Sequence, residues 1–82
     1  MQQTFVKSID GVDFECNRLM YPTRYQVLVR RPNKNPLTFT FFRSGNEWVH
    51  DEKNVNEVEY LRHLFPELTE ALQHNEKTIE QV

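Results

Sequence analysis

The sequence is poor in the residues that build disulfides, phosphate-binding loops and membrane spans. Its single cysteine, Cys16, excludes an intramolecular disulfide framework and suits a reducing compartment, so we expect a cytoplasmic protein. Only two glycines occur, Gly11 and Gly45, and neither stands in a glycine-rich phosphate loop. No apolar run approaches the roughly 18 residues of a membrane span, and no basic-then-apolar leader opens the chain. We therefore expect no membrane association.

Motifs for catalysis and metal binding are also missing. The histidines at positions 50, 63 and 74 are 13 and 11 residues apart, whereas a local zinc chelate needs three to five intervening residues. Neither G-x-S-x-G nor H-E-x-x-H occurs. Nothing pairs Cys16 with a histidine in the sequence, so we expect a small buried side chain there. We expect no enzyme, no metal site and no cofactor.

Charge is distributed unevenly along the chain. Residues 1–46 hold seven Lys or Arg against three acidic residues, and residues 47–82 hold three against nine, for a total of −2. Such asymmetry is compatible with a nucleic-acid surface beside an acidic tail. The interpretation that we favour is a basic sheet and an acidic helix that partly neutralise each other in one fold.

The strand pattern is centred on Leu37–Phe42, where apolar residues alternate with threonine at the period of a strand with one buried face. A second strand is expected from about Arg24 to Arg31, and a short one from about Glu47 to His50. Thr4–Ile9 and Val12–Asn17 form two further strands. The Asp-Gly pair between these two predicts a two-residue type I′ hairpin that pairs Ile9 with Val12, Lys7 with Phe14 and Phe5 with Cys16.

The period then changes from 2 to 3.6. Asn54 is a good N-cap with Glu57 three residues later, and apolar residues recur at helical spacing as far as Phe65. Pro66 predicts a kink or split there, because proline disfavours helical geometry at the preceding residue. A helical stripe continues to about His74.

The sequence therefore predicts an α+β fold: an antiparallel meander of about five strands, with the C-terminal helix packed on one face. We expect one domain over residues 1–74 and a flexible tail over residues 75–82. The expected core consists of the following residues: Val27, Val29, Phe39, Phe41, Trp48, Val58, Leu61 and Phe65.

The leading functional hypothesis is a small non-catalytic module for protein interaction or self-association. If Phe39 and Phe41 face the helix, Leu28, Arg30 and Phe42 share the opposite face. An exposed aromatic residue rimmed by arginine is typical of protein interfaces. The other interpretation of the same residues is an ordinary solvated face with two stray apolar side chains.

The alternative hypothesis is a weak nucleic-acid-binding domain. Its candidate contacts are the basic residues of the two middle strands and their loop: Arg24, Arg30, Arg31, Lys34 and Arg43. Sheet-based binders of single strands also need exposed aromatic rings for base stacking, for which Phe42 and Tyr25 are the candidates. Pairing of the two strands would divide the basic residues between opposite ends, which weakens this hypothesis.

Overall fold

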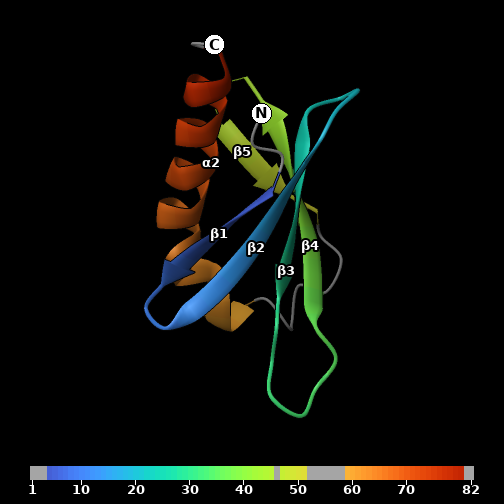
Figure 1. The fold of residues 1–82 in the computed structure, drawn as a ribbon, viewed down its shortest axis with the longest axis vertical. Coiled ribbons are helices and arrows are strands. Elements are labelled where there is room, and N and C mark those ends of the chain that lie inside the picture. The colour runs from blue at the N-terminus through green and yellow to red at the C-terminus, as the bar shows by residue number, and fades with distance from the viewer. Residues whose placement is uncertain (1–3, 46, 52–58, 81–82) are drawn as a thin grey trace.

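A computed structural model describes residues 4–45, 47–51 and 59–80 of the chain. It shows a five-stranded antiparallel sheet in the order β1-β2-β3-β4-β5, with the C-terminal helix along one face (Figure 1). The predicted α+β meander is therefore confirmed. The elements are β1 (Thr4–Ile9), β2 (Val12–Leu19), β3 (Arg24–Val29), β4 (Leu37–Ser44), β5 (Glu47–His50), the 3₁₀ helix η1 (Glu59–Leu64) and α2 (Phe65–Glu80).

The first hairpin has the predicted register. Ile9 pairs with Val12, Lys7 with Phe14, and Phe5 with Cys16. Asp10 and Gly11 have φ values of 51° and 79°, so both central residues take the positive φ that a type I′ turn requires. Aspartate tolerates this backbone region and glycine favours it, which explains how two residues fix the alignment of both strands.

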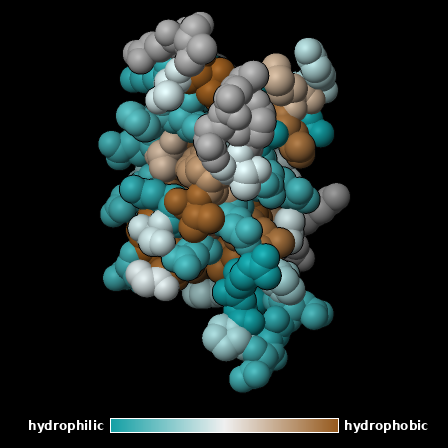
Figure 2. Space-filling view, in the orientation of Figure 1, coloured by the Kyte–Doolittle hydropathy of each residue, from teal (hydrophilic) through white to brown (hydrophobic). Residues whose placement is uncertain are grey.

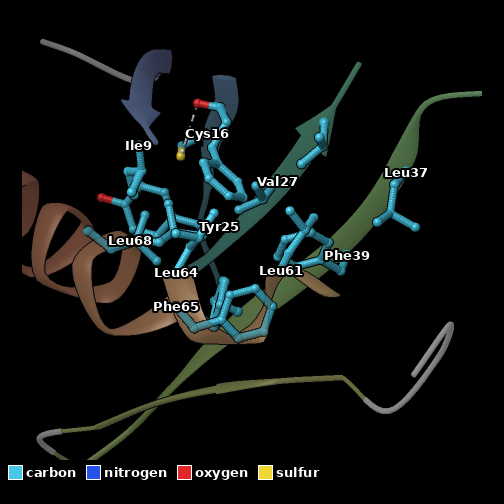
Figure 3. Close-up of a cluster of buried hydrophobic side chains, with 14 residues drawn as sticks. Ile9, Cys16, Tyr25, Val27, Leu37, Phe39, Leu61, Leu64, Phe65 and Leu68 are labelled. Carbon is cyan, nitrogen blue, oxygen red and sulfur yellow. Dashed lines mark hydrogen bonds between the residues drawn. The ribbon is translucent and has the colours of Figure 1, made fainter. Parts of the chain in front are cut away.

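One face of the sheet, here called the inner face, forms the core with the two helices. Cys16, Val27 and Phe39 lie side by side on β2, β3 and β4 and are almost fully buried. Figure 3 shows side chains from η1 and α2 packed against them. The buried cluster comprises Ile9, Phe14, Cys16, Tyr25, Val27, Val29, Leu37, Phe39, Phe41, Leu61, Leu64, Phe65, Leu68 and Leu72.

Six of the eight residues expected in the core are buried there. Trp48 is only partly buried and packs against the cluster, with its ring 5.4 Å from that of Tyr25. Its position on the edge strand β5 explains the difference, because no further strand covers its outer side among the described residues. Val58, the last of the eight, lies outside the described residues.

The helical region differs from the prediction in two ways. The first difference is that Glu59–Leu64 forms a 3₁₀ helix rather than an α-helix. The predicted N-cap pair, Asn54 and Glu57, lies outside the described residues. A kink at Pro66 is not confirmed. The helix changes from 3₁₀ to α between Leu64 and Phe65, which makes Pro66 the second residue of α2. Proline is accepted in a first turn because the N–H that it lacks has no partner there.

The second difference concerns the end of α2. The sequence predicts an end of this helix near His74 and a flexible tail over residues 75–82, but α2 continues to Glu80. Helical residues 75–80 therefore replace most of the expected tail, and residues 81–82 lie outside the described part. The physical reason is a buried contact at Glu76, which is 2% exposed and holds the last turns of the helix against the sheet.

The opposite face of the sheet, here called the outer face, is open to solvent as far as the structure describes the chain. Both helical segments place their buried side chains in the inner-face cluster. Alternate residues of the strands point the other way, so Gln26 and Phe42 are exposed while their neighbours Val27 and Phe41 are buried. No described helix therefore supplies a layer for the outer face.

Candidate functional site

Three cross-strand rows make up most of the outer face, as the strand register defines them. The Leu28 row consists of Val6, Glu15, Leu28 and Thr38. The middle row consists of Thr4, Asn17, Gln26 and Thr40. The end row consists of Leu19, Arg24, Phe42 and Val49.

The Leu28 row and the end row are rich in exposed apolar side chains, and the middle row is polar. In the end row Leu19, Phe42 and Val49 are 37%, 41% and 50% exposed. In the Leu28 row, Val6 is 57% exposed and Leu28 is half-buried. Strands of a sheet with one open face normally place polar residues on that face. Four exposed apolar residues in two rows therefore make this solvent face unusually apolar.

The structure places all three predicted interaction residues on this face but does not bring them into one cluster. The middle row separates Leu28 from Phe42. Arg30 lies beyond Leu28, where its Nε donates to Glu15 at 2.9 Å. The Arg30 side chain is 76% exposed, and an ion pair of that kind contributes little to stability. The three residues therefore span the face rather than marking one spot on it.

The β2–β3 turn extends the end row. Arg24 Nη1 donates to the carbonyl oxygens of Met20 at 3.1 Å and Pro22 at 3.0 Å, which braces the turn from the sheet side. Met20 and Tyr21 are 44% and 92% exposed. The end row and this turn together form a continuous strip of exposed apolar and aromatic side chains with one arginine.

The basic residues proposed for nucleic-acid binding are divided between two ends of the sheet. Arg30, Arg31 and Lys34 lie at or near the loop between β3 and β4, which projects from the body of the molecule (Figure 1). Figure 2 shows that this projection is hydrophilic. Arg31 donates through Nε and Nη2 to the Asn35 carbonyl at 3.0 and 2.6 Å, so part of its guanidinium closes the loop.

The remaining two arginines lie at the other end and on opposite faces. Arg24 pairs with Phe42 on the outer face, whereas Arg43 pairs with Trp48 and belongs to the inner side. Tyr25 was one of two candidates for base stacking, but it is fully buried on the inner face and cannot reach a base. Only Phe42 is left as an exposed ring of the predicted pair.

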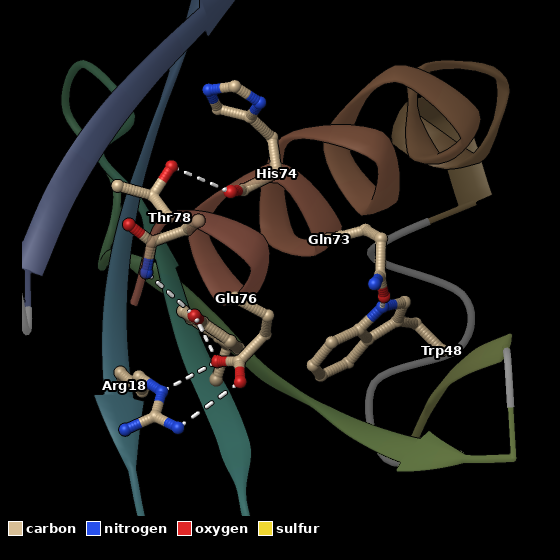
Figure 4. Close-up of polar contacts among 8 residues, drawn as sticks. Arg18, Trp48, Gln73, His74, Glu76 and Thr78 are labelled. Carbon is tan, nitrogen blue, oxygen red and sulfur yellow. Dashed lines mark hydrogen bonds and ion pairs between the residues drawn. The ribbon is translucent and has the colours of Figure 1, made fainter. Parts of the chain in front are cut away.

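A buried polar network joins β2, β3 and α2, and it is not among the features predicted from the sequence. Arg18 donates to the two carboxylate oxygens of Glu76 at 2.6 and 3.1 Å, as Figure 4 shows. The Tyr25 hydroxyl donates to Glu76 at 2.7 Å and accepts from Asn75 Nδ2 at 2.7 Å. The side chains of Arg18 and Glu76 are only 7% and 3% exposed. Solvent and substrates are excluded from this pair, which fastens the end of α2 to the sheet.

The pKa values in the network follow from burial and from these contacts. Burial alone would raise the pKa of Glu76, but hydrogen bonds from Arg18 and Tyr25 and the charges of Arg18 and Arg43 outweigh it, so the pKa is lowered. The pKa of Tyr25 is raised, mainly by burial. Glu76 is therefore held as a carboxylate and Tyr25 as a neutral hydroxyl donor.

Part of this network could have been found in the sequence. Glu76 follows Leu68 and Leu72 at intervals of four, the spacing of one helix face. Arg18 continues the alternation of Phe14 and Cys16 on β2, which ends at Leu19 rather than at Asn17 as expected. The helical spacing and the strand alternation each place a charge on an apolar face, but neither pattern identifies the partner of that charge.

Cys16 is a buried core residue, as predicted. It is fully buried, its Sγ lies 3.7 Å from the Phe14 carbonyl, and burial raises the pKa of its thiol to about 12. Such a thiol is a poor nucleophile and a poor metal ligand. Within residues 4–45, 47–51 and 59–80, no three His, Cys, Asp or Glu side chains gather closely enough to hold a metal ion. No helix in the described part is long and apolar enough to cross a membrane.

Comparison with known proteins adds no relative: no protein-family model matches the chain, and no match was found among the curated proteins or the solved structures.

Proposed function

We propose that this protein is a non-catalytic interaction module that binds another protein, or a second copy of itself, through the outer face of its sheet. The observation that carries the proposal is the pair of apolar rows on a face that no described helix covers. Leu28, Arg30 and Phe42 remain the central candidates, and the structure adds Leu19, Val49 and Tyr21 to them.

The composition of the face supports this proposal. Aromatic side chains and arginine are the residues that contribute most of the binding energy in protein interfaces. Phe42 and Arg24 stand next to each other across β4 and β3, with exposed apolar residues on both sides. The face also has Thr, Asn and Gln side chains, which supply hydrogen-bonding groups without a large desolvation cost for charge.

The alternative function, weak binding of nucleic acid, draws support from the projecting basic loop alone. Arg30, Arg31 and Lys34 lie there within a few residues of each other. However, Arg30 is paired with Glu15, and Phe42 lies on β4 at the end of the sheet away from that loop. A single-strand binder combines positive charge with stacking rings along one path, and this arrangement separates them.

The proposed function is tested with a double variant on the outer face. Leu28→Glu with Phe42→Glu places charge in both apolar rows, and His74→Glu is the matched control because His74 is exposed on α2, which packs on the inner face. We expect the double variant to stay folded and to lose any oligomer or bound protein partner, while the control keeps it. Solution mass by light scattering and affinity capture with each variant measure this. Equal behaviour of all three proteins would show that the outer face is not a binding surface.

The alternative is tested by salt. Binding to phosphates releases counterions, so affinity for a single-stranded oligonucleotide would fall steeply between about 50 and 200 mM salt. Replacement of Arg30, Arg31 and Lys34 by Ala would abolish that binding. We expect no salt-dependent binding in the parent protein, and association through the outer face that tolerates the same salt range. Fluorescence anisotropy of a labelled oligonucleotide provides the measurement.

A further inference from the structure

We propose that the partner of the outer face is the same face of a second copy, related by a two-fold axis that crosses the strands over Gln26. This inference rests on the proposed function and adds the identity and the orientation of the partner to it. Two-fold dimers are the commonest soluble oligomers, and they require a surface that is complementary to itself. The outer face meets that requirement in its charges and in the order of its rows.

The charges select one of two simple arrangements. An axis that runs along β3 would place each row over the same row of the second copy, so that Arg24 would lie over Arg24. An axis that crosses the strands at the middle row exchanges the other two rows instead. Arg24 of each copy then approaches the row that contains Glu15. Like charges in direct opposition are costly and opposite charges are not, so the crossing axis is favoured.

The known angle between packed sheets improves this fit. Sheets that pack face to face cross at about 30° because each sheet is twisted. Such a crossing, in the direction that twisted sheets adopt, displaces each end-row residue toward the neighbouring strand of the second copy. Arg24 on β3 then lies over Glu15 on β2, and Phe42 on β4 lies over Leu28 on β3. Both contacts occur twice, once on each side of the axis.

The middle row lies on the axis, and its residues are suited to meeting their own copies. Gln26 is exposed and has both a donor and an acceptor on its amide, so two symmetry-related amides can bond each other. Thr4 and Asn17 already share a hydrogen bond of 2.8 Å on the same row. A row of amides and hydroxyls between two apolar rows thus gives a polar centre that fixes the register of the dimer.

A pair of charge reversals tests the orientation. In Arg24→Glu, two glutamates face each other at both contacts of the dimer, and in Glu15→Lys the same is true of two cations. Each variant alone is expected to raise the dissociation constant roughly tenfold or more. An equimolar mixture restores both contacts, because each copy of one variant meets its opposite charge on the other. We expect the mixture to recover the solution mass of the parent at the same total concentration.

The mixture separates the intermolecular contact from effects within one chain. Arg24→Glu also loses the bonds to Met20 and Pro22, and Glu15→Lys loses the pair with Arg30. Mixing two chains cannot restore either loss, so recovery requires contact between copies. A mixture whose mass equals the average of the two separate variants would overturn the proposed orientation.

Cross-linking tests the position of the axis independently. A cysteine in Gln26→Cys is expected to join to its own copy through a bismaleimide of about 10 Å, the separation of stacked sheets. Lys34→Cys on the projecting loop is the control and is expected to give no covalent dimer. The native Cys16 is fully buried and stays unreacted in both variants. A covalent dimer from the control alone, or from neither variant, would contradict the position of the axis.

The outcomes distinguish this inference from the proposed function. A parent protein that stays monomeric at every concentration overturns the second copy as partner. If Leu28→Glu with Phe42→Glu then still loses a captured protein that His74→Glu retains, the proposed function stands without the dimer. If the parent dimerises but the double variant dimerises equally well, both proposals fail together.

Discussion

Two adjacent phenylalanines on β4 show how differently the two faces of the sheet are used. Phe41 is 1% exposed on the inner face, and its ring packs 5.2 Å from that of Phe65. Phe42 is 41% exposed on the outer face and has Arg24 as its cross-strand neighbour. Burial of the phenylalanine ring therefore stabilises the fold on one face, whereas on the other face the exposed ring is unfavourable for solubility. The difference indicates that the inner face determines the fold and that the outer face is the place to look for function.

The first prediction compares these two residues directly. Phe41→Ala is expected to lower the free energy of unfolding by about 3–5 kcal/mol, because it leaves a cavity among Phe39, Phe65 and His50. That is a large part of the stability of so small a domain. Phe42→Ala is the matched control and is expected to change it by no more than about 1 kcal/mol. Urea unfolding followed by circular dichroism measures both, and equal losses would show that the faces do not differ.

The second prediction removes one partner of the buried ion pair on the inner side. Glu76→Ala leaves the Arg18 guanidinium and the Tyr25 hydroxyl without their acceptor. The expected loss of stability is about 3 kcal/mol, since a buried charge without its counterpart is strongly unfavourable. Replacement of both partners, Arg18→Met with Glu76→Leu, is expected to recover most of that loss. A double variant as unstable as Glu76→Ala would mean that the network, not the unpaired charge, determines the cost.

The two faces also differ in how far the sequence predicts them. The Asp10–Gly11 pair determines a register that the structure reproduces residue by residue, because a two-residue turn leaves no choice of pairing. Alternation on β3 and β4 predicts which side chains are buried for the same local reason. The Arg18–Glu76 pair joins residues 58 positions apart, and nothing local links them. The end of α2 is mostly polar, so without knowledge of that contact the sequence predicts an end of the helix near His74.

The candidate site shows a similar limit. Leu28, Arg30 and Phe42 were placed on one face correctly, since a strand period of two is enough to assign a face. The row that Phe42 shares with Leu19 and Arg24 depends on the register between strands whose connections are longer than two residues, whereas only residues 45–46 join the strands that place Val49 beside Phe42. Tyr25, in contrast, follows from the same period, because it alternates with Val27 and Val29 and therefore belongs to the inner face, where it lies opposite Phe41.

The third prediction concerns pH and acts on the inner side alone. The pKa of Glu76 is lowered in the folded protein, whereas the unfolded chain has the ordinary value near 4.5. Below that value the unfolded chain takes up a proton that the folded protein resists, so stability is lost as the pH falls and is fully present above it. We expect the free energy of unfolding to decline from about pH 5 toward pH 3, and Glu76→Gln to show a shallower decline. A decline in Glu76→Gln as steep as that of the parent would show that Glu76 does not carry this pH dependence.

The smallest effect is expected on the outer face, where it separates stability from binding. Leu28→Glu with Phe42→Glu removes apolar area that is already in contact with water, so the free energy of unfolding of the monomer is expected to change by about 1 kcal/mol at most. The measurement has to be made at a concentration below that of any association, because a dimer adds its own stabilisation to the folded state. If association occurs through this face, the parent gains stability with concentration and the double variant does not. Urea midpoints at two concentrations a hundredfold apart therefore decide the matter in one experiment. A large loss at low concentration would make Leu28 and Phe42 structural residues, and the contrast between the two faces would then disappear.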